Sequence, residues 1–558
     1  MFDYCYDSDS GGLILSFNNG AKSIRSARPV FAEEMVMYGF DRYFKFDPDE
    51  KRPYMWVELN SYYYRGVKIA RVTGGDLNSD PVLTVYKDLL TAAELEPIDV
   101  DLMNKRNDEQ LNFLYATTVA RLEDFIDKSH DTIKHFYASY SGGKDSDVVL
   151  DLIAQSRYAH DVDIVYCDTD MEALETYKHV VQVAKRCEDA QIPFHFAGSH
   201  LNSFDSWKLF APPSRVCRWC CTVHKSTPIA LRMKSVGGVG KTATFVGVRW
   251  EESPKRSTYD FVSDDIKING QTVFYPILDW SLSELWMYIL RRNIPVCSLY
   301  RNGFRRIGCI VCSQAAGRRD WVSKERLRAQ VDPYKKIIIE SDTVLDTNNP
   351  ESYWKSGGWH NRQNGFYVRG NRKRKEYDQT ETHYIVRMRF AEDTLDEWRK
   401  IVGGGGDRKD GSFVCDYFGE QITVETERDN EWTVYKIPRV KRKIYRQFLS
   451  DFKKLVDRAC YCVGCRTCEV ECEYSAVTFP NGKVKIDNCR QCRKCLNSLS
   501  YFGWGCVRGH SLSFPVTKSE EERELMVKKR FERISKVKGE EVETIDDQIE
   551  EVLQNEEV

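Results

Sequence analysis

The middle of the chain has the most regular pattern of hydrophobic and polar positions, because short apolar runs alternate there with helical periods. The apolar runs predict four strands, at 135–140, 163–167, 193–196 and 243–247. The helical periods that follow the first two predict helices at 145–156 and 171–187. Short strands that alternate with helices are typical of a parallel sheet with helices on both faces. We therefore expect an α/β fold in this region.

The regions on either side of this pattern differ from it and from each other. Short strand-like runs separated by Gly, Asn, Asp and Pro come before it, and aromatic-rich and basic segments follow it. We expect five parts: a small β-rich N-terminal domain of unknown role at 1–130, the α/β domain at 131–330, a basic, mixed α+β region at 331–455, a cysteine-rich module at 456–515 and a charged helical tail at 516–558.

Length and composition exclude some classes of protein. A chain of 558 residues is too long for a single core. No apolar stretch approaches the roughly 20 residues that a membrane-spanning helix needs. The first residues lack the basic region and apolar run of a secretion signal, so we expect a cytoplasmic protein without a membrane partner. The net charge of −2 averages over basic and acidic clusters and therefore identifies no partner.

A glycine-containing segment joins the first predicted strand to the first predicted helix. In this context glycines let the backbone approach a phosphate closely, and the N–H groups that begin the helix face the anion. A lysine adds positive charge, two serines add hydroxyl donors, and Asp145 is a candidate ligand for Mg²⁺. A plain glycine turn with its lysine in solvent is the alternative. The predicted phosphate-binding residues are Ser141, Gly142, Gly143, Lys144, Asp145 and Ser146.

This loop and several later segments resemble, in order, the motifs of the phosphoadenosine phosphosulfate (PAPS) reductase family of PP-loop ATP pyrophosphatases. The segments are 141–146, 166–169 with Glu172 and Thr176, 218–221 with Lys225 and Pro228, 247–253 with Arg256, 276–277 with Trp280, and Tyr300 with Gly303, Arg306, Gly308 and Cys309. The resemblance covers about 133–325. It implies a PP-loop fold, which is a parallel sheet of the adenine nucleotide α-hydrolase kind.

The resemblance also implies roles for individual residues. In that family the loop binds ATP or an adenylyl sulfonucleotide at the carboxyl ends of the strands. Asp168 would then lie beside the ribose or the metal, and Arg249 and Lys225 near the phosphates or the second substrate. Each of these three is otherwise an ordinary surface or salt-bridge residue. The candidate catalytic residues are Lys144, Asp145, Arg249 and Lys225, with ATP and Mg²⁺ as cofactors.

Cysteine usage adds a second kind of chemistry. Nineteen cysteines in an expected reducing compartment argue against disulfides, and thirteen of them fall into two groups with metal-ligand spacing. Cys220 and Cys221 with Cys309 and Cys312 resemble the arrangement that holds a [4Fe-4S] cluster in adenylyl-sulfate reductases. Zinc is the alternative, because Cys217-x-x-Cys220 with Cys309-x-x-Cys312 is equally a four-thiolate zinc pattern.

The second group of cysteines resembles a bacterial ferredoxin-like module, in which two interleaved motifs bind two [4Fe-4S] clusters. One predicted cluster has a full set of ligands, Cys472, Cys489, Cys492 and Cys495. The first three ligands of the other are Cys462, Cys465 and Cys468. Leu499 occupies the expected fourth position, and we expect Cys506 to replace it, with Cys460 as the second choice. A single-cluster module and a zinc site are the alternatives.

Two basic segments suit the phosphate backbone of a nucleic acid. The first interleaves Trp359, Phe366 and Tyr367 with cations, which are Arg362, Arg369, Arg372, Lys373, Arg374 and Lys375. The second contains Lys436, Arg439, Lys441, Arg442, Lys443 and Arg446. Because charge runs are usually solvated surface, DNA binding and a plain solvated face are both open for these segments.

By resemblance, an oxygen of the second substrate attacks the α-phosphate of ATP, pyrophosphate leaves, and the adenylated oxygen becomes a leaving group. The sequence has no Glu-Cys-Gly-x-His motif, the C-terminal signature of PAPS reductases, which argues against simple sulfonucleotide reduction. Relatives with this loss and with iron-sulfur ligands look like the DNA phosphorothioation proteins of the DndC and SspD types. The partners implied are DNA, a cysteine desulfurase or other sulfur donor, and an electron donor. The alternatives are an iron-sulfur PAPS or APS reductase or sulfotransferase, a tRNA thiolation enzyme, and a nucleotide-sensing scaffold.

Overall fold

The computed structural model folds as two compact units, each made of two stretches of the chain. Unit 1 comprises Met1–Ala197 and Arg232–Val331, and unit 2 comprises Gly198–Leu231 and Asp332–Val558. The structure describes residues 2–17, 26–75, 79–86, 94–236, 241–264, 271–315, 318–341, 351, 354, 357–366, 368–390, 392–409, 411–497 and 506–514. The tail predicted at 516–558 lies outside these residues, and the five predicted domain boundaries stay predictions.

Unit 1 is built on a six-stranded sheet with the strand order β10-β9-β8-β11-β13-β12. Strand β8 pairs in parallel with β9 and β11, β11 pairs in parallel with β13, and β12 runs antiparallel at the edge. The strands are β8 (His135–Tyr140), β9 (Val162–Asp168), β10 (Phe194–Gly198), β11 (Thr242–Phe245), β12 (Val262–Asp264) and β13 (Gln271–Phe274). The four strands predicted from apolar runs and the parallel sheet are confirmed.

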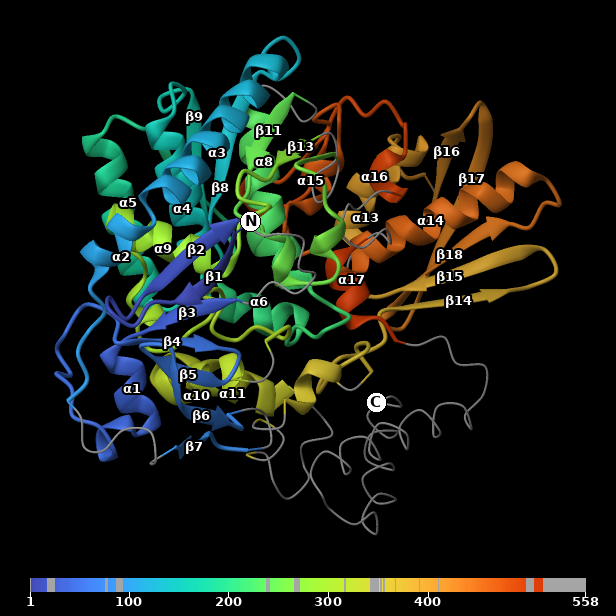
Figure 1. Ribbon diagram of the computed structural model, residues 1–558. Helices are drawn as coiled ribbons and strands as arrows, with labels where there is room; N and C mark the ends of the chain where they lie inside the picture. The colour runs from blue at the N-terminus through green and yellow to red at the C-terminus, as the bar shows by residue number, and fades with distance from the viewer. Residues whose placement is uncertain are drawn as a thin grey trace. The chain divides into compact units, whose positions relative to one another are not determined.

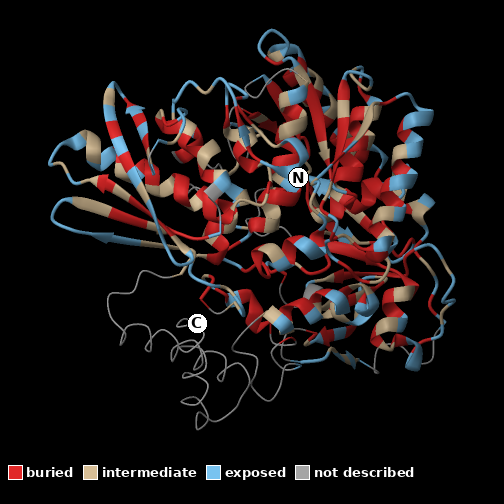
Figure 2. Ribbon diagram, turned by 180° about the vertical axis from the view of Figure 1, so that it is seen from behind, coloured by how far each residue is buried: buried red, intermediate tan, exposed pale blue. Residues whose placement is uncertain are grey.

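The central strands are buried on both faces. Tyr137 and Ala138 are consecutive in β8, and Ile164 and Val165 are consecutive in β9, and all four are at most 3% exposed. Since successive side chains of a strand point to opposite faces, both sides of the sheet are covered (Figure 2). Continuous apolar runs rather than alternating ones are the sequence pattern that such strands require.

Helices connect and cover these strands. The helices predicted after β8 and β9 are confirmed, as α4 (Lys144–Gln155) and α5 (Leu174–Asp189). Helix α4 contacts β8, α3 and α9. The other α-helices that lie wholly within the described residues of unit 1 are α1 (Ala32–Tyr38), α2 (Val100–Arg106), α3 (Asp108–Ser129), α9 (Leu282–Arg292) and α10 (Arg318–Arg326).

A second sheet at the N-terminus of unit 1 confirms the predicted β-rich region (Figure 1). Its five strands pair antiparallel in chain order, after a hairpin of β1 (Phe2–Tyr6) and β2 (Leu13–Phe17). The five strands are β3 (Ala27–Val30), β4 (Met55–Glu58), β5 (Ser61–Tyr64), β6 (Val67–Thr73) and β7 (Val82–Val85). Met55, Tyr62 and Ile69 are fully buried in the core between this sheet and α1.

Unit 2 contains an antiparallel sheet with the order β14-β15-β18-β17-β16 and a long helix, α14 (Lys443–Tyr461). The strands are β14 (Lys375–Gln379), β15 (His383–Met388), β16 (Ser412–Tyr417), β17 (Glu420–Asp429) and β18 (Trp432–Pro438). Phe448, Phe452 and Leu455 share one face of α14, and they pack into one core with Val386, Tyr435 and several cysteines of the module that follows.

The cysteine-rich part of unit 2 is made of short elements. They are α15 (Thr467–Glu471), the hairpin of β19 (Val477–Thr478) and β20 (Lys485–Ile486), α16 (Lys494–Asn497) and α17 (Val507–Leu512). Unit 2 also contains α6 (Ser203–Phe210), α7 (Trp219–Cys221), the π-helix η3 (Thr222–Ser226) and α13 (Glu392–Trp398). Two helices, α8 (Thr227–Ser235) and α11 (Arg328–Ser341), each have residues in both units. None of the helices in the described residues is long and apolar enough to traverse a lipid bilayer.

Candidate functional site

The predicted phosphate loop lies where β8 ends and α4 begins. Gly142 has φ +69°, and a Cβ atom there would lie 2.9 Å from Cγ2 of Val180, so only glycine fits this turn. The Ser146 hydroxyl accepts hydrogen bonds from the N–H groups of Ser141 and Gly143, both at 3.2 Å, and donates to the Gly143 carbonyl at 2.7 Å. Ser146, expected to donate to phosphate, therefore holds the loop itself in shape.

Two buried cations share one carboxylate at the start of α4. Nζ of Lys144 lies 2.7 Å from Oδ2 of Asp145, and Nε of Arg249 lies 2.8 Å from its Oδ1. Both cations are 3% exposed. Burial would raise the pKa of Asp145, but the two neighbouring cations hold it well below its usual range. Burial lowers the pKa of Lys144, against the opposing effect of Asp145. The structure thus brings the predicted residues Lys144, Asp145 and Arg249 together.

Further carboxylates extend this group along the segment after β11. Arg249 also pairs with Glu251, and Arg256 pairs with Glu252. The three arginine and lysine charges are therefore each matched by a carboxylate. A phosphate that binds these cations would have to replace the carboxylates as their partners. The carboxylate oxygens released in this way are the type of ligand that Mg²⁺ prefers.

A buried triad behind the loop was not predicted from the sequence. Asp147, on the first turn of α4, accepts a hydrogen bond from Oη of Tyr140 at 2.6 Å and lies 2.9 Å from Nε2 of His179. Burial raises the pKa of Asp147, and its bonds to His179 and Tyr140 act against this rise. The triad joins β8, α4 and α5, so it fixes the position at which α4 starts. The spacing of these three residues along the chain does not identify the triad, because only the folding of the sheet and its helices brings them together.

Tyr300 contacts the loop from a segment far along the chain. Its hydroxyl accepts a hydrogen bond from the backbone N–H of Lys144 at 3.1 Å, and its ring centroid lies 5.4 Å from Nζ of Lys144. The next residue, Arg301, is anchored on the N-terminal sheet region by Glu33 at 2.7 Å and by the carbonyls of Lys51 and Glu50, at 2.8 and 3.0 Å. The N-terminal region therefore positions a residue of the loop site.

Asp168 lies at the carboxyl end of β9, and its place beside the ribose or the metal stays a prediction. Its Oδ1 accepts a hydrogen bond from Oη of Tyr177 at 2.8 Å. Beside it, Oγ1 of Thr169 donates to Glu172 at 2.6 Å and lies 3.4 Å from Sγ of Cys309. A hydrogen-bonded chain thus runs within unit 1 from the end of β9 to one of the predicted cluster ligands.

The remaining predicted residues of the α/β domain are divided between the units. Cys309 and Cys312 belong to unit 1. Lys225 lies on the π-helix η3 of unit 2, and this unit also contains Cys217, Cys220 and Cys221. The expectations that Lys225 joins the phosphate site, and that the five cysteines share one cluster or zinc ion, stay predictions.

In the cysteine-rich part of unit 2, two cavities are each lined by four cysteines. The first is lined by Cys462, Cys465, Cys468 and Cys506. The second is lined by Cys472, Cys489, Cys492 and Cys495. Cys460, the second choice for a ligand, lies apart from both, and its thiol donates to the carbonyl of Arg374 at 3.4 Å.

The thiols of each cavity interact with one another. Burial raises the pKa of Cys462 and Cys506 to about 12, and the neighbouring thiols add to the rise. Burial likewise raises the pKa of Cys495 to about 12. Such thiols stay protonated until a metal displaces the protons. In the described residues, no three His, Cys, Asp or Glu side chains are grouped tightly enough for a single metal ion.

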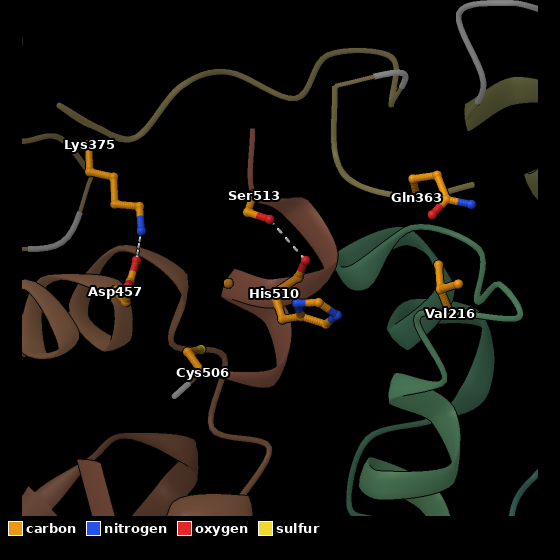
Figure 3. Close-up of a pocket in the computed structure, with 8 residues that line it drawn as sticks. Val216, Gln363, Lys375, Asp457, Cys506, His510 and Ser513 are labelled. Carbon is orange, nitrogen blue, oxygen red and sulfur yellow. Dashed lines mark hydrogen bonds and ion pairs between the residues drawn. The ribbon is translucent and has the colours of Figure 1, made fainter. Parts of the chain in front are cut away.

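A larger cavity of about 330 Å³ borders the first four-cysteine cavity at Cys506 (Figure 3). Lys375 and Asp457 pair on its wall, and His510 also faces it. By sequence, Lys375 is among the cations of the first basic segment that could contact a nucleic acid. In the structure Lys375 instead pairs with Asp457 of the same unit. Arg362 is buried and donates to the carbonyls of Pro212 and Ser511. Trp359 and Phe366 are also buried, so they are not available to stack on bases.

Comparison with known proteins places the loop and its partners Arg249 and Tyr300 within one matched domain. The phosphoadenosine phosphosulfate reductase domain matches residues 135–315. The adenosine 5'-phosphosulfate reductase of Anoxybacillus flavithermus is 30% identical over 182 residues, which are 32% of this chain and 72% of that protein. The chain belongs to the PAPS reductase family.

Two further comparisons match this PAPS reductase family member over part of its length. Uncharacterized protein MJ0066 of Methanocaldococcus jannaschii is 31% identical over 216 residues, which are 38% of this chain but only 42% of that protein. The PAPS reductase of Candida auris, solved with phosphate, is 19% identical, with a TM-score of 0.27 over 39% of this chain and 98% of its own. The matched domain contains the loop, Asp168, Arg249, Cys309 and Cys312.

Proposed function

We propose that the protein is a PP-loop ATP pyrophosphatase that adenylates an oxygen of its substrate for sulfur incorporation, and that the substrate is the DNA backbone. The observation that carries the first part is the pair of buried cations, Lys144 and Arg249, on either side of Asp145 at the N-terminus of α4. Backbone N–H groups at a helix start and two desolvated cations are what a polyphosphate requires.

The chain's own residues can supply the catalysis by position and charge. The residues fit Mg-ATP, because Lys144 and Arg249 are cations for its phosphates, and Asp145, Glu251 and Glu252 offer oxygen ligands beside them. Lys144 and Arg249 neutralise the charge that builds on the phosphates as pyrophosphate leaves. Tyr300 and the Asp147 triad keep the loop in the geometry that the attack needs.

The two four-cysteine cavities fit [4Fe-4S] clusters, because each offers the four thiols that a cluster requires. Cys462, Cys465, Cys468 and Cys506 would hold one, and Cys472, Cys489, Cys492 and Cys495 the other. When bound, such clusters supply one-electron transfer. The cluster or zinc ion expected from the sequence for Cys217, Cys220, Cys221, Cys309 and Cys312 stays a prediction. The partners proposed are an electron donor and a cysteine desulfurase or other sulfur donor.

A reductase is the second candidate, because relatives that match most of their length are named adenosine 5'-phosphosulfate reductases. The test is pyrophosphate release from ATP by the anaerobically purified protein, with DNA, tRNA or adenylyl sulfate added in turn. Stimulation by DNA supports phosphorothioation, and stimulation by tRNA supports thiolation instead. Sulfite formation from the sulfonucleotide without pyrophosphate release contradicts the proposal and identifies a reductase.

Glycine at position 247 provides a prediction for the loop. A Cβ atom at Gly247 would lie 2.8 Å from the backbone carbonyl of Asp145, so Gly247→Ala pushes the loop out of position. We expect kcat/KM for ATP to fall about 100-fold, as for other displacements of about 1 Å. Gly406→Ala is the control, because a Cβ there meets no atom within 4 Å. Equal activity of the two variants would mean that this close approach has no part in ATP use.

The DNA proposal makes a prediction about the exposed cations of the first basic segment. Arg369, Arg372 and Lys373 are exposed, unlike Arg362. Changing all three to Ala should weaken DNA binding, and each lost phosphate contact should lower the slope of log K against log salt by about 0.9. Fluorescence anisotropy at several salt concentrations measures both quantities.

The matched control removes the same number of charges elsewhere. Lys178, Lys185 and Arg186 are exposed on α5 of unit 1 and belong to neither basic segment. Their replacement by Ala should leave affinity and salt slope close to those of the wild type. If both triple variants behave alike, the basic segment has no specific role in DNA binding.

A further inference from the structure

Helix α14 contains an arginine that is buried as deeply as the apolar core around it. Arg458 is 1% exposed and lies on the side of α14 that faces the cysteine-rich part of unit 2. Burying a guanidinium group costs a large amount of free energy unless a group of opposite charge compensates it. Backbone carbonyls can accept from the N–H groups of a buried arginine, but they carry no net charge that offsets the charge of the guanidinium.

Within the described part of the chain, no carboxylate pairs with Arg458. The two acidic residues on the second half of the same helix are engaged elsewhere, because Asp451 accepts from Oη of Tyr417 at 2.8 Å and Asp457 pairs with Lys375. The guanidinium donates only to backbone carbonyls, those of Lys454, at 3.4 Å, and Cys495. Its Nε is buried and has no hydrogen-bond partner among the described residues.

Arg458 lies between the two four-cysteine cavities. It lines the cavity of Cys462, Cys465, Cys468 and Cys506. Through its bond to the carbonyl of Cys495 it also reaches a residue that lines the other cavity. Each cavity is therefore within the field of the same buried positive charge. A [4Fe-4S] cluster with four thiolate ligands is an anion, which is the group that this charge lacks.

We propose that Arg458 is the shared counter-charge of two [4Fe-4S] clusters, one in each four-cysteine cavity, and that it raises the reduction potentials of both. This proposal rests on the proposed function, which assigns clusters to these cavities. Reduction adds negative charge, and a buried cation stabilises the more negative state more strongly. Replacing Arg458 with an uncharged residue should therefore make both clusters harder to reduce.

Arg508 offers a comparison, because it lines only the first cavity. Its Nε donates to the carbonyl of Leu209 at 2.7 Å, and it is less buried than Arg458. Removal of its charge should affect the cluster of Cys506 and leave the other nearly unchanged. The number of clusters that respond therefore distinguishes the role of Arg458 from that of an ordinary neighbouring charge.

The experiment is a redox titration followed by electron paramagnetic resonance on the full, cluster-loaded chain. Arg458→Met, which keeps the length of the side chain without its charge, should lower both equilibrium constants for reduction about tenfold, or about 59 mV for a one-electron couple. Arg508→Met should shift one cluster, and Arg458→Lys should restore much of the loss. Arg446→Met is the control, since Arg446 is exposed on the same helix.

Each outcome decides the proposal. Unchanged potentials in Arg458→Met, relative to Arg446→Met, overturn it. If Arg458→Met loses iron while Arg458→Lys retains it, the charge is needed to hold the clusters, which supports the proposal. Loss of iron from both variants would mean that the shape of arginine matters and not its charge. Absence of iron-sulfur signals from the wild-type protein would instead contradict the proposed function.

Discussion

Under the proposed function, we expect Lys144→Ala to lower pyrophosphate release strongly while the visible absorption expected of the proposed clusters stays intact. Lys144 is the only lysine of the phosphate loop, and its buried ammonium is oriented by Asp145 at 2.7 Å. Losing one such charge-stabilising group typically lowers kcat by about 100- to 1000-fold. The measurement is the rate of pyrophosphate formation from ATP by anaerobically purified wild-type and variant proteins, with iron content determined on the same samples.

Lys178→Ala is the matched control, because Lys178 is exposed on α5 and lies outside the loop. It should retain wild-type activity. Ser146→Ala should resemble Lys144→Ala in activity, since the Ser146 hydroxyl accepts two loop N–H groups. If Lys144→Ala loses its iron as well as its activity, the loop is a structural element. Undiminished pyrophosphate release would remove Lys144 from the proposed mechanism.

If the two four-cysteine cavities hold the proposed clusters, we expect Cys506→Ser to remove iron equivalent to one cluster and Cys460→Ser to leave the iron content unchanged. Cys506 lines the same cavity as Cys462, Cys465 and Cys468, and the thiol of Cys460 points instead at the carbonyl of Arg374. Serine is a poor ligand for iron, so the first cavity should lose its cluster while the second keeps its own. Iron analysis with electron paramagnetic resonance of the reduced protein measures the difference.

Cys489→Ser provides the complementary comparison, because Cys489 lines the second cavity. It should remove the cluster that Cys506→Ser retains. If Cys460→Ser lost iron and Cys506→Ser did not, Cys460 rather than Cys506 would be the fourth ligand of the first cluster. Equal loss in all three variants would indicate that the cysteines act together in folding this part of unit 2.

The positions of the strands could be predicted from the sequence because β8 and β9 are buried on both faces. Continuous apolar runs between glycine-rich or polar turns can then form little else. The phosphate loop was recognisable for a related reason, since its glycines and Lys144 are adjacent in the chain. Arg249 was predicted only through the family resemblance, because 104 residues separate it from Asp145.

The Tyr140–Asp147–His179 triad and the contact of Tyr300 with Lys144 could not be predicted from the sequence. Their residues come from different strands and helices, and a histidine or tyrosine in an apolar period has the pattern of ordinary core. The same reason explains why the buried residues of the basic segment could not be told from its exposed ones. Charge along the chain does not reveal that Arg362 is buried among carbonyls, because burial is set by contacts with segments that are distant in sequence.

The fourth ligand of the first four-cysteine cavity could be predicted from the sequence only in part. Spacing identified Cys462, Cys465 and Cys468, but Leu499 interrupted the pattern and left two candidate replacements. The structure brings Cys506 into the cavity from the start of α17. Arg458 had no sequence signal at all, since a single arginine in an amphipathic helix normally reaches solvent.

The anchoring of Arg301 by the N-terminal sheet region has a consequence for the matched domain on its own. Glu33 and the carbonyls of Glu50 and Lys51 hold the residue next to Tyr300, which in turn bonds to the backbone of Lys144. The loop site therefore depends on residues that are not part of the matched domain at 135–315. The matched domain produced without the N-terminal sheet would lose the anchors of Arg301, and Tyr300 would be held less firmly against the loop.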